Sequence, residues 1–147
     1  MKYLILCIGN RDGGDDSVGP YIFDKLNQEK PKNIELIDAG TAPENYTGKV
    51  KQINPEILII IDAIDMNLDP GEIRIVPKEK IGVMHVSTHG IPISVLVKYL
   101  EQYVKEIFIV GIQPKEMSGK MTDKVKKSAQ DFVKLIKKDE VQKIKKL

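Results

Sequence analysis

Apolar runs alternate with amphipathic segments along this chain, and each kind predicts a different element. Continuous apolar runs predict strands that are buried on both faces, at Tyr3–Ile8, Ile34–Ile37, Ile57–Ile61 and Ile107–Val110. Apolar residues spaced by three and four predict helices over Val18–Asn27, after Pro92, and over about 122–140. The alternation of strands with helices is typical of a layered α/β fold.

Two further segments complete the expected layout. Glu72–Val76 follows a Pro-Gly turn and alternates apolar with polar residues, which predicts a half-exposed strand suited to an antiparallel edge position. Val50–Ile53 fits either a short strand or the end of a connection. We therefore expect one domain over residues 1–147, with three layers: a twisted, mostly parallel sheet of about five strands, flanked by helices. The last residues are expected to fray.

Length and composition limit the class of protein. The chain has 147 residues, of which 41% are apolar and 30% charged, as expected of one ordinary domain. None of its apolar runs approaches the roughly 20 residues that a membrane-spanning helix needs, so no membrane insertion is expected. The first apolar run is too short for a secretory signal, and Cys7 is the single cysteine, which cannot form an internal disulfide. We expect a cytoplasmic protein.

The net charge of +2 conceals an uneven distribution. Residues 120–147 carry ten lysines against four acids, whereas residues 1–119 have a net charge of −4. Only two of the 23 basic residues are arginines, and the basic end has one aromatic residue, Phe132. Nucleic-acid binding usually relies on arginine interleaved with aromatic residues, so we expect no nucleic-acid partner. The spacing of the apolar residues in this basic end instead indicates a packed helix with a solvated outer face.

A glycine-rich turn follows the first predicted strand. Gly9 and Gly14 have the spacing of the two glycines in a phosphate-binding loop. The next residues, Asp15 and Asp16, replace the lysine and hydroxyl residue of that loop and would repel a phosphate. The pair suits a cation or a proton transfer, although acids in a first helical turn can also simply complement the helix dipole.

Further aspartates fall at or just after predicted strand ends. They are Asp38, Asp62 and Asp65. In a parallel sheet these ends share one edge, so Asp16, Asp38 and Asp62 are expected to gather there. Single aspartates at such places are commonly turn formers, and the Asp-Ala-Gly sequence at Asp38 fits that alternative best.

The two histidines, His85 and His89, lie in a segment that leads into a predicted helix. They are four residues apart but lack the intervening glutamate of a zinc-protease helix, and Gly90 and Pro92 indicate a loop. A loop histidine is about as often a structural hydrogen-bonding residue as a ligand. Asp16, Asp62 and one histidine would make a mixed nitrogen and oxygen set suited to nickel or zinc. His89 is the better candidate, and His85 is kept as a surface or supporting residue.

Nucleophilic catalysis has weaker support. Ser17 or Ser87 could form a triad with His89 and Asp62, but the chain has no G-x-S-x-G elbow. Cys7 lies inside the first predicted strand, where a core role is expected.

Taken together, these residues resemble the hydrogenase maturation endopeptidases, especially the type that processes the large subunit of formate-hydrogenlyase-like, energy-converting NiFe hydrogenases. The matching segments are Gly9-Asn10, Gly14-Asp15-Asp16, Gly19-Pro20, Ala42–Asn45, Asp62–Met66, Asn67–Arg74, Ser87-Thr88-His89 and Gly111–Pro114. Ser17 departs from the glycine usual after the acidic pair, and the lysine-rich end lies outside the resemblance.

The resemblance implies a fold, an activity and a site. The fold is a twisted sheet flanked by helices, of the phosphorylase/hydrolase-like kind. The activity is removal of a C-terminal extension from the NiFe-hydrogenase large-subunit precursor after nickel insertion, by a peptidase classed as aspartic-type. Asp16, Asp62 and His89 match the catalytic, metal-engaging residues, and the nickel is expected to come with the substrate rather than to be bound tightly by the free enzyme. Asp38 is our candidate helper in hydrolysis.

Two other classes of function remain open at this point. One is a non-catalytic nickel-binding α/β module or metallochaperone, which would bind metal without proteolysis. The other is a metal-dependent hydrolase of small molecules, which would need its own tightly bound zinc.

Overall fold

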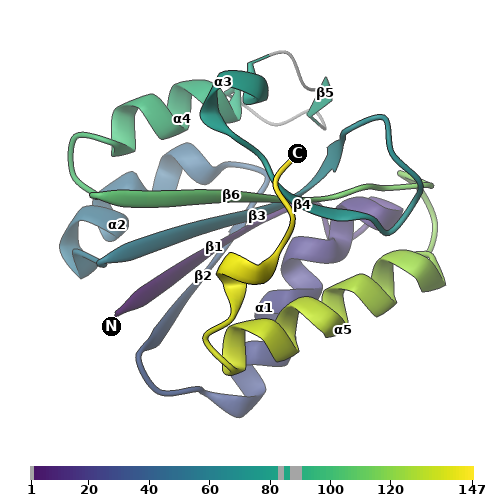
Figure 1. Cartoon of the computed structure of the whole chain (residues 1–147), viewed down its shortest axis with the longest axis horizontal. Helices are drawn as coiled ribbons and strands as arrows, with labels where there is room; N and C mark the ends of the chain where they lie inside the picture. The colour runs from purple at the N-terminus through teal and green to yellow at the C-terminus, as the bar shows by residue number, and fades with distance from the viewer. Residues whose placement is uncertain (1, 83–84, 87–90) are drawn as a thin grey trace.

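Five strands of one twisted sheet lie in the order β2-β1-β3-β6-β4, and a sixth described strand, β5 (His85–Val86), pairs with β3 off this path (Figure 1). The computed structural model describes residues 2–82, 85–86 and 91–147. The strands of the sheet are β1 (Tyr3–Ile8), β2 (Ile34–Gly40), β3 (Ile57–Asp65), β4 (Ile73–Ile75) and β6 (Glu106–Ile112). The pairs along this order are parallel except β4 with β6, and β5 is antiparallel to β3. The predicted α/β fold with an antiparallel edge strand is confirmed.

Helices cover both faces of the sheet (Figure 1). One face packs against α1 (Val18–Glu29) and α5 (Asp123–Lys137). The other packs against α2 (Thr47–Ile53), α3 (Lys78–Ile81) and α4 (Ile93–Leu100). Short 3-10 helices are η1 (Gly14–Ser17), η2 (Pro43–Tyr46) and η3 (Val141–Lys143). No helix in the described ranges is long and apolar enough to cross a membrane.

Alternate residues of β3 pack against different helical layers. In β3, Ile59 and Ile61 belong to the core under α1 and α5, whereas Ile60 and Ile64 belong to the core under α2 and α4. Successive strand residues point to opposite faces, so Asp62 is on the α2 and α4 side. This placement matters for the site because the carboxyl ends of β1, β3 and β6 meet at one edge.

Strands β2 and β3 extend beyond their predicted ends. β3 continues to Asp65 because β6 pairs with it as far as Ala63 and the two-residue strand β5 (His85–Val86) pairs with Ile64 and Asp65. The prediction that Asp62 lies at or just past a strand end was therefore wrong, and Asp38 also lies within its strand, β2. The pairing partners that prolong these strands are distant in sequence.

Two further segments differ from expectation. The uncertain Val50–Ile53 segment is the second half of α2, which continues directly from η2 and buries Val50 against the sheet. The chain end, expected to fray, is docked: Ile144 is buried, Ile75 N–H donates to Lys145 O at 2.8 Å, and Leu147 N–H donates to Ile75 O at 2.9 Å. The last residues thus cover the outer edge of β4.

Helix α1 approaches β1 closely at Gly19, which yields a test of the packing. A Cβ at Gly19 would lie 2.1 Å from Ile8 O, whereas a Cβ at Gly48 in α2 would meet no atom within 4 Å. We expect Gly19→Ala to lower the free energy of unfolding by about 2–3 kcal/mol, since a packed interface must separate. Gly48→Ala should raise it by about 0.5–1 kcal/mol through helix propensity. Urea denaturation measures both, and equal effects would contradict this packing.

Candidate active site

The turn after β1 is held by close backbone contacts that orient Asp16. A Cβ at Gly9 would lie 2.0 Å from Asp16 O, so only glycine fits there. The N–H of Asn10 donates to Asp16 Oδ2 at 3.1 Å, and the side chain of Asp16 is almost fully buried, at 6% exposure. Ser17, which departs from the usual glycine, donates its hydroxyl to Gly14 O at 2.6 Å and closes η1.

Asp15 has a different role from its neighbour. Its carboxylate is fully buried and accepts backbone N–H groups of Lys115, Glu116 and Thr122 at 2.7–2.9 Å. The Thr122 hydroxyl also donates to it, and Asp15 N–H donates to Glu116 O at 2.7 Å. Asp15 therefore joins the glycine turn to the loop that precedes α5. The sequence suggested a cation or a proton transfer for the Asp15-Asp16 pair, with complement of the helix dipole as the alternative, and neither includes this contact.

Asp62 lies at the same edge as Asp16. It pairs in register with Gly111 of β6 and has no solvent-exposed surface. Element η1, which contains Asp16, is in contact with β3. The structure thus brings two of the three predicted metal-engaging residues to neighbouring elements, and both carboxylates are shielded from water. The third, His89, lies outside the described residues, as do Ser87 and the side chain of His85.

Asp38 is engaged by Arg11. Arg11 Nη2 donates to Asp38 Oδ2 at 2.6 Å, and both guanidinium Nη atoms bind the carboxylate of Asp24 at 2.8 and 3.0 Å. The Arg11 hydrogen bonds lower the pKa of Asp24. Asp38 also accepts the Gly40 N–H at 3.3 Å. The arginine between two acids bridges the glycine turn, α1 and β2, which the sequence pattern did not indicate.

Gln113 is a second residue that the pattern missed. Its buried side chain accepts the N–H of Met66 at 2.6 Å and of Leu68 at 3.3 Å, and its amide donates to Asp65 Oδ1 at 3.1 Å. These bonds fix the segment after β3. The sequence feature that could have indicated Gln113 is its position as a polar residue directly after a buried strand, in the Gly111–Pro114 segment.

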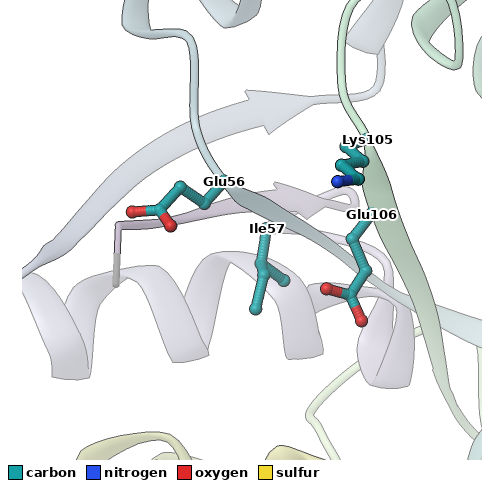
Figure 2. A pocket seen from close by; sticks show the side chains of 4 residues that line it. All are labelled: Glu56, Ile57, Lys105 and Glu106. Carbon is teal, nitrogen blue, oxygen red and sulfur yellow. The ribbon is translucent and has the colours of Figure 1, made fainter.

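Two other candidates are set aside by their surroundings. Cys7 is buried in the sheet, and burial raises the pKa of its thiol, so it is a core residue rather than a nucleophile. A surface hollow of about 490 Å³ is lined by Glu56, Ile57, Lys105 and Glu106, with the two carboxylates on either side of Ile57 (Figure 2). It lies at the amino ends of β3 and β6, opposite the edge that carries Asp16 and Asp62.

Comparison with known proteins identifies the family to which the chain belongs. A family model described as hydrogenase maturation protease (HycI) matches residues 20–139. The chain belongs to this family. The hydrogenase maturation protease family inferred from the sequence motifs is therefore confirmed, and the protein is an endopeptidase of that family.

Relatives of this protease agree in sequence and in structure. The hydrogenase 3 maturation protease of Escherichia coli K12 is 39% identical over 115 residues, which cover 78% of this chain and 74% of that protein. The solution structure of the endopeptidase HycI from Escherichia coli has a TM-score of 0.92, at 33% identity, and covers 100% of this chain and 97% of that chain. The HycI crystal structure from Thermococcus kodakarensis has a TM-score of 0.83, at 28% identity, covering 95% and 92%.

The family model begins after Asp16 but includes Asp38, Asp62 and His89. The full coverage by the Escherichia coli structure extends the likeness to the glycine turn of this protease. Within the parts of the chain that the structure describes, no group of three or more His, Cys, Asp or Glu side chains is arranged to hold a metal ion.

The Asp15 contact yields a test of the site's framework. We expect Asp15→Asn to lower the free energy of unfolding by about 2–4 kcal/mol, because an amide retains one acceptor oxygen and turns its NH₂ toward buried donors. Asp12→Asn, one turn away and exposed, is the matched control and should change stability by less than about 0.5 kcal/mol. Urea denaturation measures both; a small loss for Asp15→Asn would show that the two loops are joined by other contacts.

Proposed function

We propose that this protease removes a C-terminal extension from a NiFe-hydrogenase large-subunit precursor after nickel has been inserted, and that Asp16, Asp62 and His89 engage that nickel. The observation that carries the proposal is the burial of Asp16 and Asp62 on neighbouring elements at the carboxyl edge of the sheet. Two anionic groups shielded from water at one place favour a bound cation. The family of the chain supplies the hydrogenase context.

The donor set suits the cation of such a substrate. Two carboxylate oxygens and an imidazole nitrogen are ligands that a borderline divalent metal such as nickel accepts. A nickel ion already held by substrate cysteines would be completed by these three side chains. A precursor without nickel could not make the same contacts, so specificity arises from binding that only the loaded precursor provides.

Peptide hydrolysis at this edge requires a base near the scissile bond. A carboxylate would take a proton from water while the oxygen attacks the carbonyl carbon, and the C–N bond then breaks as the amine leaves with a proton. We propose Asp38 as the group that assists this step. Its contact with Arg11 is at the protein surface, where the ion pair is weak enough to open when substrate binds.

The nickel requirement is tested by cleavage of nickel-loaded and nickel-free precursor in parallel. We expect wild-type protein to cleave only the loaded form. Asp16→Asn, Asp62→Asn and His89→Ala should each lower the cleavage rate at least about 100-fold, because each removes a group that holds the nickel and thereby the scissile bond. The readout is the mobility shift of the shortened large subunit.

Matched substitutions control for this experiment. Asp12→Asn and His85→Ala replace the same residue types near the predicted ligands and should retain most of the activity. Equal cleavage of both precursors would refute the nickel check, and full activity of Asp16→Asn, Asp62→Asn and His89→Ala would refute the site.

The role of Asp38 has its own test, because Asp24 shares the same arginine. Asp38→Asn should lower kcat on nickel-loaded precursor about 100-fold if its carboxylate assists proton transfer. Asp24→Asn removes the other partner of Arg11 and should leave kcat within about threefold of wild type. Similar losses of kcat in both variants would show that Asp38 acts only through its ion pair with Arg11.

A further inference from the structure

One outer surface of this protease combines exposed aromatic residues with a lysine. We define the aromatic–lysine surface as Val95 and Tyr99 of α4, Tyr103 of the following turn, and Lys51 of α2. Val95 is 53% exposed, Tyr99 37% and Tyr103 45%. Val95 and Tyr99 are four residues apart and lie on one side of α4, and the ring of Tyr103 contacts that of Tyr99, so the three side chains form a stripe. Of the described large apolar residues that are exposed, only Met117 lies elsewhere.

Contacts within the surface arrange it before any partner binds. Lys51 Nζ donates to Tyr99 Oη at 2.9 Å and lies 5.3 and 4.7 Å from the ring centroids of Tyr99 and Tyr103. The two rings are 5.5 Å apart between centroids, at an interplanar angle of 53°. Aromatic side chains held in this way lose little conformational entropy on binding, which is typical of the centres of protein interfaces.

The charge around the stripe is positive, although the first 119 residues as a whole are acidic. Helices α2 and α4 contain Lys49, Lys51 and Lys98 and no acidic residue. Glu101, just after α4, forms an ion pair with Lys78 at 3.3 Å. The complementary partner is therefore a protein segment that presents carboxylates beside apolar side chains.

The stripe lies on the same face of the sheet as Asp62. Helix α4 precedes β6 and lies over the middle and the amino-end part of the sheet, with its end next to the start of β6 (Figure 1). Asp62 shares the side of the sheet that α2 and α4 cover. A protein substrate bound at the carboxyl edge would reach the stripe by extending over this face of the sheet.

We propose that the aromatic–lysine surface docks an acidic and apolar segment of the large-subunit precursor, outside the cleaved extension. This proposal rests on the proposed function, since it assumes the same substrate. Docking here would raise affinity without contacting the reacting atoms, so its loss would change KM rather than kcat.

The experiment compares charge reversal on the two faces of the sheet. Lys51→Glu should raise KM for nickel-loaded precursor about tenfold and leave kcat within twofold, and Val95→Ser with Tyr99→Ser should do the same. Lys25→Glu is the matched control: Lys25 Nζ lies 5.5 Å from the Tyr21 ring centroid on α1, on the opposite face, and its KM should stay within twofold. Circular dichroism and Tm verify folding, because all these side chains have exposed surface.

The outcomes separate this proposal from the proposed function. KM within twofold of wild type for both surface variants, or an equal rise for Lys25→Glu, overturns the docking site. If the wild-type protein is a dimer, and Lys51→Glu dissociates it without changing KM, a second copy of the chain occupies the surface. That result also overturns the docking site. If wild-type protein binds precursor but does not cleave it, the proposed function fails, and Kd of wild type against Lys51→Glu then tests docking alone, with a tenfold weakening expected.

Discussion

The buried carboxylate of Asp15 is the interaction on which the active-site edge depends. It accepts N–H groups from the segment between β6 and α5, which contains no helix or strand, and so joins this segment to the turn after β1. Successive residues of a 3-10 helix point about 120° apart, so Asp15 and Asp16 in η1 face different surroundings. One carboxylate is used to hold two loops together, and the position of the other follows from it.

The sequence patterns predicted the sheet and the helices that flank it, but they did not predict the contacts between residues far apart in the sequence. The apolar run at Tyr3–Ile8 predicted β1 with the bounds that the structure has, because a strand buried on both faces admits few polar residues. The partners of Asp15 lie about 100 residues away, and the Arg11 pairing with Asp38 spans 27 positions. Such contacts depend on tertiary packing, and no local period reveals them. The extension of β3 past Asp62 is of the same kind, because its neighbours supply the added pairing.

The distribution of lysines shows why charge alone does not define an interaction surface. Helix α5 carries many lysines, but its single aromatic residue, Phe132, is fully buried in the core. Its outer face is therefore charged without an apolar centre, as expected of a solvated helix. Lys51 differs because its ammonium lies against two exposed tyrosine rings. Partial desolvation beside apolar area makes a charge useful for recognition, whereas isolated surface charges contribute little.

The two proposed binding regions, the aromatic–lysine surface and the carboxyl edge with Asp16 and Asp62, would have different roles in recognising the precursor. The proposed contacts along α4 would be the same for a precursor with or without nickel, so they could add affinity but could not discriminate between the two. The proposed contacts of Asp16 and Asp62 with the metal would exist only in the loaded form, so they would discriminate, and they would also place the scissile bond. Binding energy from the remote surface can then offset the cost of holding the substrate in a reactive position. Strand β3 and helix α4 contribute to a common core, so the proposed docking surface and Asp62 belong to elements of one packed layer.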